Sequence, residues 1–239
     1  MKALKFTLSG KTAFFKKPDV NQYAYFTYNN IHKIALLGIL GAVIGLKGYN
    51  QQNREKYPEF YEKLKDFKIS VVPIKKYFDK KIQIFNNTVG YASQEANNIL
   101  NVREQWLEEP EWEIYILENQ TDEYKKLEDY LLNKKTEFIP YLGKNDHSAD
   151  INSVEKINLS KEEKIDHIDS LFLEKICDLD VYTHDDEYEF ILKEKQPIKL
   201  NEKYNFYEFE NTIYTNLEIE RVENISDIYA HNNKVLHFF

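Results

Sequence analysis

The chain has 239 residues and is therefore long enough to bury a sizeable core. Of these residues 42% are hydrophobic and 15% aromatic, a composition that excludes a disordered protein. Its formal net charge of −8 argues, taken alone, against a nucleic-acid partner. Residues 1–90, however, carry sixteen Lys or Arg against six Asp or Glu, a net charge of +10, and residues 91–239 carry sixteen against thirty-four, a net charge of −18. Either these charges all lie on ordinary solvated surface, or the basic half forms one face that binds a polyanion.

The N-terminal segment alternates apolar and polar residues. In residues 2–8, Leu4, Phe6 and Leu8 fall on one face, which predicts a strand with an apolar side. The segment turns polar too soon for a secretory signal peptide. We therefore expect a soluble cytoplasmic protein.

Residues 11–30 follow as a loop or hairpin, with Pro18, Asp19 and Asn21 as turn material. Six aromatic residues and three lysines alternate along it. They are Lys11, Phe14, Phe15, Lys16, Lys17, Tyr23, Tyr25, Phe26 and Tyr28. Exposed rings among lysines suit base stacking with phosphate contact, and the alternative is that these rings fold into the core.

The longest apolar run, residues 31–46, contains three glycines and predicts a buried helix that packs its glycine face against a sheet. Its uncharged part is too short to cross a bilayer, which needs about 20 residues. Asn29 or Asn30 is the expected N-cap and Gly48 the expected stop. The exposed N–H groups of the first turn would form a phosphate site beside His32 and Lys33.

The middle of the chain predicts further regular elements. A short helix is expected from residue 58 to 67, followed by a strand pair, 67–74 and 81–86, joined by a lysine-rich turn. Alternation predicts a strand over 111–118, and residues 121–134 predict an amphipathic helix capped by Thr121.

A last strand is expected over residues 138–142, ending at Gly143. The resulting order is β-α-β-β-α-β. This predicts an α+β fold with a ferredoxin-like core, an arrangement used by RNA-recognition domains. Gly143 permits unusual backbone angles, so Lys144, Asn145 and His147 would present polar groups at the strand end. The alternative is an ordinary polar β-turn.

After residue 150 the pattern weakens. We expect a helix over 160–176 and strands over 187–193, 203–209 and 212–220, which gives a β-rich C-terminal part. The predicted domains are therefore 1–150 and 151–239. The single Cys177 fits a reducing compartment and a buried apolar position.

Several chemical motifs are absent from the sequence. No phosphate-binding loop of the GK[ST] type, no GxSxG and no dinucleotide-binding fingerprint occurs, and the histidines are scattered without a metal-ligand spacing. We therefore expect no cofactor and no metal.

Four strings together are similar to a known family. LSGKTAFFKKP and GILGAVIGL near the N-terminus, REQWLEEPEWEIYI from Arg103 and PYLGKNDHSADI from Pro140 occur in the order seen there. The chain resembles CRISPR-associated protein family five, the RAMP subunit of type I interference complexes, in particular its type I-B branch.

The resemblance implies a ferredoxin-like core with a thumb hairpin at about residues 11–30. It implies a non-catalytic subunit that caps the 5′ handle of the CRISPR RNA in the Cascade complex during antiviral DNA interference. Its partners would be that RNA, the backbone and large subunits and, through the complex, target DNA.

The resemblance also places candidate RNA contacts in three segments. They are Lys11, Phe14, Phe15, Lys16, Lys17 and Tyr25 in the thumb, Asn29, His32 and Lys33 at the start of the glycine-bearing helix, and Tyr141, Gly143, Lys144, Asn145 and His147 at the strand end. Many relatives carry two arginines where this chain has Lys144 and Asn145, so a bidentate arginine contact is not expected there.

Two alternatives stay open. The first is a metal-independent endoribonuclease that processes precursor RNA, for which Tyr49, His32 and His147 would be the acid and base candidates. The second is a protein-interaction domain whose basic half meets an acidic partner.

Overall fold

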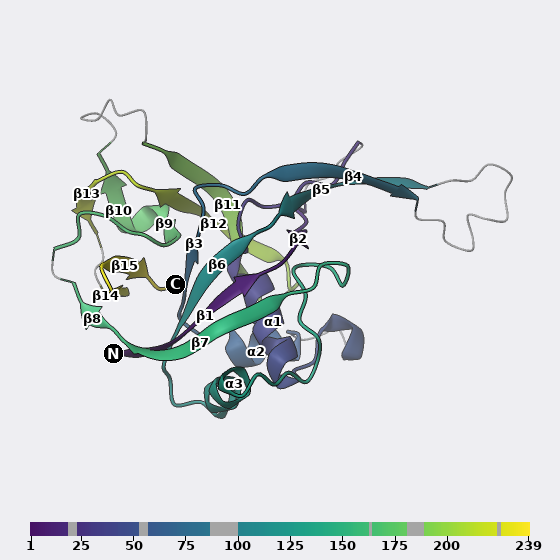
Figure 1. The fold of residues 1–239 in the computed structure, drawn as a ribbon, viewed down its shortest axis with the longest axis horizontal. Helices are drawn as coiled ribbons and strands as arrows, with labels where there is room; N and C mark the ends of the chain where they lie inside the picture. Colours follow the sequence, from purple (N-terminus) through teal and green to yellow (C-terminus); the bar gives the residue numbers. More distant parts are fainter. Residues whose placement is uncertain (19–22, 53–56, 87–99, 163, 181–188, 224–225) are drawn as a thin grey trace, which may run out of the picture.

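The computed structural model describes residues 1–18, 23–52, 57–86, 100–162, 164–180, 189–223 and 226–239. The chain is a mixed α/β protein, rich in sheet and poor in helix (Figure 1). Its helices are α1 (Lys33–Ile44), α2 (Glu59–Leu64) and α3 (Asp122–Leu132), with 3-10 turns at Tyr49–Gln51 and Glu174–Ile176.

The central sheet has four antiparallel strands in the order β3-β6-β1-β7. Their bounds are β1 (Lys2–Ser9), β3 (Ile69–Pro73), β6 (Glu111–Leu117) and β7 (Asp150–Asn158). α1 lies between β1 and β3 in the chain, and α3 lies between β6 and β7. The predicted strands near residues 2–8 and 111–118 and the helix near 121–134 are confirmed, including the Thr121 side chain, which accepts the Tyr124 N–H at 3.2 Å.

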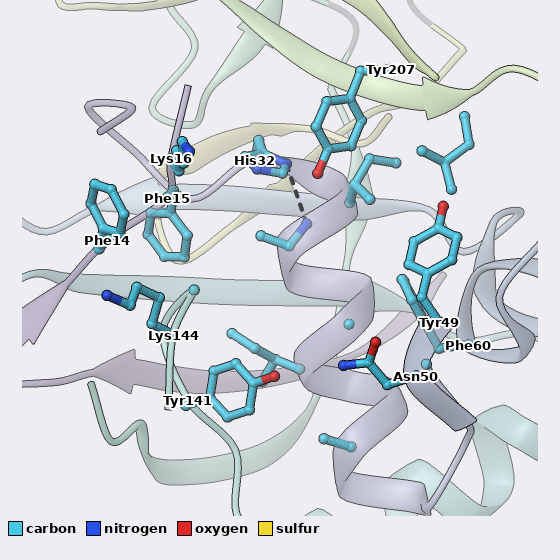
Figure 2. A pocket seen from close by; sticks show the side chains of 18 of the residues that line it. Phe14, Phe15, Lys16, His32, Tyr49, Asn50, Phe60, Tyr141, Lys144 and Tyr207 are labelled. Carbon is cyan, nitrogen blue, oxygen red and sulfur yellow. Dashed lines mark hydrogen bonds between the residues drawn. The ribbon is translucent and has the colours of Figure 1, made fainter. Parts of the chain in front are cut away.

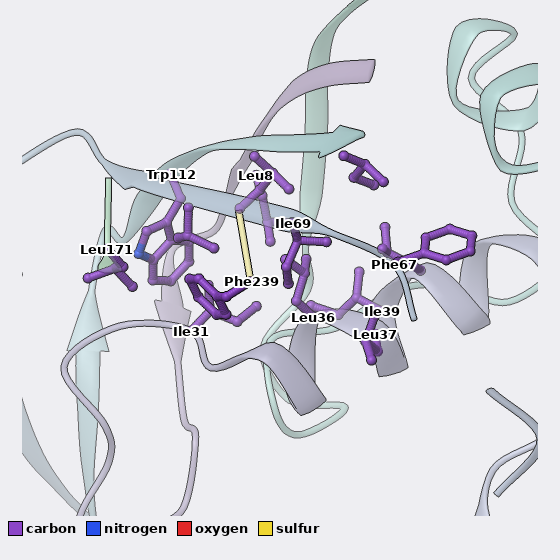
Figure 3. Packing of buried hydrophobic residues seen from close by; sticks show 14 of the residues in the cluster. Leu8, Ile31, Leu36, Leu37, Ile39, Phe67, Ile69, Trp112, Leu171 and Phe239 are labelled. Atoms are coloured by element: carbon purple, nitrogen blue, oxygen red, sulfur yellow. The ribbon is translucent and has the colours of Figure 1, made fainter. Parts of the chain in front are cut away.

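The two faces of this sheet pack against different elements. Leu4, Phe6 and Leu8 of β1 join the core cluster that also contains the α1 side chains, as the alternation predicts. Figure 3 shows Leu8 and the α1 residues Leu36 and Leu37 in this cluster. The opposite face, with Ala3 and Tyr115, packs against a smaller cluster from the C-terminal strands. The sheet is therefore covered on both sides, and the helices share one side (Figure 1).

α1 is buried as predicted, but its ends and its glycine contacts differ from the expectation. Its N-cap is His32, not Asn29 or Asn30, and its C-cap is Gly45, in the left-handed region at φ 83°, rather than Gly48. Gly41 faces α2, where a Cβ would lie 2.5 Å from the Cβ of Phe60, so the close glycine contact is with a helix and not with the sheet. In the described part of the chain, none of the helices combines the length and apolar character that crossing a membrane requires.

The predicted pairing of strands 67–74 and 81–86 is wrong, although both strands exist. β3 pairs with β6, and β4 (Lys80–Asn86) instead pairs with β5 (Asn101–Glu108), a strand that the pattern did not predict. The β4–β5 hairpin projects from the body of the molecule (Figure 1). β2 (Thr12–Ala13) pairs with β5, and Lys16 forms an antiparallel bridge with Thr27, so the described part of residues 11–30 folds back on itself beside β5. The turn residues Asp19 and Asn21 lie outside the described residues.

Residues 138–142 are not a strand, because their ladder pairing is limited to an isolated bridge between Tyr141 and Ser148. Phe138 and Ile139 are exposed (46% and 82%). The fourth strand of the sheet is β7 instead. The backbone of this segment does have a partner, because Phe138 N–H donates to the carbonyl of Ala42 at the end of α1 at 3.1 Å.

The C-terminal part is β-rich as predicted, but the helix expected over 160–176 does not form in the described residues. That stretch contains β8 (Ser160–Lys161), β9 (Phe172–Leu173) and the second 3-10 turn. The remaining strands are β10 (Cys177–Leu179), β11 (Ile191–Leu200), β12 (Tyr207–Thr215), β13 (Ile219–Val222), β14 (Ile228–His231) and β15 (Lys234–His237). β11 packs against α1, and Cys177 is buried as expected.

Candidate functional site

A large groove of about 1390 Å³ runs along the outer face of α1. Its walls come from four parts of the chain: residues 14–18 with Tyr25, the 3-10 turn after α1, residues 138–144, and the turn and strand ends of β11 and β12 (Figure 2). The floor is the α1 face that carries Ala35, Gly38 and Ala42. These residues are spaced three and four apart and so share one side of the helix.

The groove brings together eight of the fourteen residues that the sequence singles out. They are Phe14, Phe15, Lys16, Tyr25, His32, Tyr141, Gly143 and Lys144. These residues are spread from position 14 to position 144 and converge only in the folded protein. The groove is therefore the candidate functional site.

Lys16 is the exposed cation at this site. Its Nζ lies 3.7 Å from the centroid of the half-buried Tyr25 ring, a cation–π contact, and the described residues contain no ion-pair partner for it. Tyr25 is held by backbone bonds to β5, where its N–H donates to the carbonyl of Arg103 at 2.9 Å. The pair offers a positive charge and an aromatic surface together.

Lys144 is also at the groove, but its charge is already compensated. Its Nζ lies 3.0 Å from a carboxylate oxygen of Glu104, whose residue is only 5% exposed. The Glu104 carboxylate also accepts the indole N–H of Trp106 at 2.9 Å. Lys144 is therefore fixed in place and has less charge to offer a phosphate than Lys16 has.

Gly143 has the unusual backbone that its sequence context predicts. Its φ is +91°, and a Cβ built on it would collide with the carbonyl oxygen of Phe14. The approach is fixed by Phe14 N–H, which donates to the carbonyl of Leu142 at 3.0 Å. Glycine is needed here both for the backbone angle and for the close contact.

Phe14 and Phe15 line the groove, but each is only 2% exposed. Phe15 packs against Trp112 and His32, with ring centroids 6.0 and 6.2 Å apart, and Phe14 lies within reach of the Lys144 ammonium. This is a correction to their expected role, because a ring needs an open face to stack on a base. Both are core residues that support the groove, as the alternative interpretation of the aromatic residues allowed.

His32 caps α1 through its ring. Its Nδ1 accepts the Ala35 N–H at 3.2 Å, so in the neutral ring Nε2 carries the proton. The ring stands edge-on to Tyr28 and Tyr207, with centroids 5.1 and 5.9 Å apart. Burial lowers the pKa of His32 to about 3, so it is neutral at pH 7 and cannot serve as a cationic phosphate ligand.

This burial predicts a loss of stability in weak acid. Burial lowers the pKa of His32 to about 3 and that of His237 to about 4, so unfolding takes up a proton at each once the pH falls below about 6.5. Stability from these two groups is complete above about pH 6.5 and should fall toward pH 4 by about 1.4 kcal/mol per pH unit for each histidine. Urea denaturation at pH 7 and pH 5 measures the change.

The control is His32→Asn, which keeps a capping side chain and removes the titrating ring. The variant should lose less stability than the wild type between the two pH values. An equal loss in both proteins would contradict the assignment to His32.

The other six predicted residues lie away from the groove wall. They are Lys11, Lys17, Asn29, Lys33, Asn145 and His147. Lys17 pairs with Glu194 at 2.8 Å, and the Asn29 N–H donates to the same carboxylate. Lys33 is buried at the first turn of α1, and burial lowers its pKa to about 8.

His147 is 1% exposed, with Nδ1 2.6 Å from the Thr12 hydroxyl and its ring edge-on to Trp106 at 4.6 Å. Burial lowers its pKa. Both side chains are packed inside the protein, so the RNA contacts that we expected for Lys33 and His147 are corrected. Lys11 and Asn145 are exposed outside the groove.

The groove also has residues that the sequence pattern missed as binding candidates. The β11–β12 turn contributes Asn205 and Phe206, the first residue of β12 contributes Tyr207, and the 3-10 turn contributes Tyr49 and Asn50. Phe206 is 70% exposed. The dense aromatic string at 204–209 was the only available signal. Within the described residues, no three His, Cys, Asp or Glu side chains come together in a way that could hold a metal.

Comparison with known proteins gives a fold and no sequence relative. No family model matches the chain, and no curated protein matches it. Its structure is similar to one titled as a CRISPR RNA-guided surveillance complex, with TM-score 0.55, 13% identity and 91% of each chain covered. It is also similar to a CRISPR protein from Archaeoglobus fulgidus, with TM-score 0.51, 11% identity, and 99% of this chain and 98% of that one covered. The likeness shows a shared fold over almost the whole length.

Proposed function

We propose that the chain is a non-catalytic subunit of a CRISPR effector complex, of type I and subtype I-B, that binds and caps the 5′ handle of the CRISPR RNA. The observation that supports this most is the groove, which gathers Lys16, Tyr25, Tyr141 and Lys144, four residues that the sequence singles out, around one surface. The shared fold with CRISPR-associated structures and the four sequence strings support the family. Backbone and large subunits would be its protein partners, and target DNA would meet it through the complex.

The arrangement of the central sheet supports the ferredoxin-like part of this proposal. Along the chain, the elements of this sheet follow the order β1, α1, β3, β6, α3 and β7, which is a β-α-β-β-α-β succession. In space, the strands lie in the order β3-β6-β1-β7. Because β7 belongs to this sheet, we propose that the first domain extends to about residue 158 and that the β-rich part follows it.

The groove suits single-stranded RNA better than a duplex. Exposed or half-buried rings at Tyr25, Tyr141 and Tyr207 offer stacking surfaces, and Lys16 offers a phosphate contact. Single-stranded RNA is held by this combination, since unpaired bases stack on rings while lysines contact the backbone.

The groove's side chains favour binding over cleavage. Metal-independent cleavage needs a proton acceptor or donor beside the 2′-hydroxyl. His32 has a pKa of about 3 and binds a proton weakly, His147 is enclosed, and burial raises the pKa of Tyr49. We therefore propose no catalytic residue. Repeat RNA that is cut by the isolated protein in EDTA would establish the endoribonuclease alternative instead.

Lys16→Ala is expected to weaken RNA binding and to flatten its salt dependence. On single-stranded RNA, the slope of log K against log salt falls by about 0.7 for each phosphate that the protein no longer neutralises. Titration of fluorescent single-stranded RNA at several salt concentrations measures this slope. The control is Lys125→Ala on α3, whose side chain is 61% exposed and lies outside the groove.

Equal slopes for Lys16→Ala and the wild type would remove Lys16 from the interface. If a protein partner stays bound after nuclease treatment and no RNA is found, the protein-interaction alternative is favoured.

A further inference from the structure

Of the two glycines on α1 near the groove, Gly38 has room for a side chain and Gly41 does not. A Cβ on Gly38 would meet only Phe60 Cε2, at 3.9 Å, an ordinary contact. Gly41, on the neighbouring side, is already covered by Phe60. Gly38 thus forms a flat, open floor, and Ala35 and Ala42 on either side extend it.

Polar groups surround this floor. His32 is 5% exposed and lines the groove, and the described residues provide no hydrogen-bond partner for its Nε2 proton. Figure 2 shows Tyr207 near the His32 end of α1, and Tyr141 and Asn50 on opposite sides of the helix further along it. All three line the groove. A donor that opens into a groove bonds to water in the free protein, and the polar edge of a ligand can replace that water.

Aromatic residues at the β11–β12 turn form one wall of the groove. Tyr207 lies edge-on to His32, and the neighbouring Phe206 stacks on Tyr204 with centroids 5.6 Å apart and planes at 25°. The turn that carries them is fixed by Asn201, whose side-chain oxygen accepts the N–H groups of Lys203 and Tyr204 at 3.0 and 3.2 Å. This wall is therefore formed before any ligand arrives.

The charges at the groove fit a neutral ligand with polar edges. Glu104, the acidic residue of the lining, is neutralised by Lys144, His32 is uncharged at pH 7, and Lys16 stands apart beside Tyr25. A planar ring with donors and acceptors on its edge fits the floor, while a phosphate fits Lys16.

We infer that the floor over Gly38 takes one unstacked nucleobase of the bound RNA, with its ring between α1 and Tyr207 and its edge within reach of His32 and Asn50. The inference rests on the proposed function and adds the C-terminal turn to the RNA-binding surface. The base is held in a pocket and is not stacked on its neighbours in the strand.

The test uses Gly38→Leu in the assembled complex. The leucine enters the open space, and since glycine disfavours helix, thermal stability should be kept or raised. The RNA that co-purifies with the wild type is resynthesised with one abasic site at each position in turn, and its affinity for wild type and variant is measured. Lys125→Leu on α3 is the control.

We expect one position whose abasic form binds the wild type at least about tenfold more weakly, as the loss of a well-stacked base should produce. Gly38→Leu should lower the affinity for the intact RNA by a similar factor. The abasic site at that position should then cause no further loss of affinity in the variant. RNA bound equally by wild type and variant, with no sensitive position, overturns the pocket and leaves the proposed function standing.

The nucleobase pocket is also overturned if the Gly38→Leu complex loses a partner protein while its RNA affinity is unchanged, because a polypeptide then occupies the groove. A wild-type complex without RNA rejects the proposed function, and with it this inference.

Discussion

Trp112→Ala is expected to lower the free energy of unfolding by about 3–5 kcal/mol, the usual cost of truncating a large aromatic residue in a core. Trp112 is fully buried on β6, and its indole N–H donates to the Asn30 side-chain oxygen at 3.0 Å. Its ring packs on Phe15 and Phe78, with centroids 6.0 and 5.2 Å away. Urea denaturation measures the loss.

RNA affinity should fall with stability in this variant, because Trp112 supports the segment that carries Lys16. The control is Trp112→Phe, which keeps an aromatic ring and loses the hydrogen bond to Asn30. Because the buried Asn30 oxygen then lacks a donor, we expect this variant to lose about 1–3 kcal/mol of its free energy of unfolding. A loss below about 1 kcal/mol for Trp112→Ala would show that this packing is not formed in solution.

Gly143→Ala is the second change with a large expected effect. The left-handed backbone alone costs roughly 1–3 kcal/mol for a residue with a side chain. The new methyl group would also meet the Phe14 carbonyl, so either residues 14–16 or 141–144 must move. We expect a lower midpoint of thermal unfolding and weaker RNA binding, because both segments line the groove.

The control for this variant is Gly48→Ala. Gly48 also lines the groove, but its φ is −100° and no atom lies within 4 Å of a Cβ built on it. It should unfold within about 0.5 kcal/mol of the wild type, as surface substitutions usually do. If the two alanine variants are equally stable, the close approach at Gly143 is not present in solution.

Local patterns in the sequence predicted β1, β6 and α3, because alternation and helical spacing depend on neighbouring residues alone. The cap of α1 was missed for a chemical reason. His32 accepts the Ala35 N–H through a ring nitrogen, whereas Asn29 and Asn30 have the side chains that usually cap helices. The strand pairing was predicted wrongly because β3 pairs with β6 and β4 pairs with β5, and a local sequence pattern carries no information on which strands pair.

The candidate site was predictable where a motif carried it and not where distant segments meet. Gly143 could be identified from its place before a polar string, and its positive φ confirms the reason given for it. The neutralisation of Lys144 by Glu104 joins residues 40 positions apart. Tyr207 reaches His32 only because β11 packs against α1, and no spacing in the sequence reveals that contact.

The most direct test of the account is the nucleic acid that accompanies the protein. The chain is expressed with a CRISPR array and the neighbouring subunits, purified through a tag, and the bound RNA is sequenced after ultraviolet crosslinking to locate the contacted peptides. We expect short RNAs with one common repeat-derived 5′ end, crosslinked to peptides that contain Tyr25, Tyr141 or Tyr207. Purified complex without RNA, or RNA crosslinked only to other subunits, would contradict it.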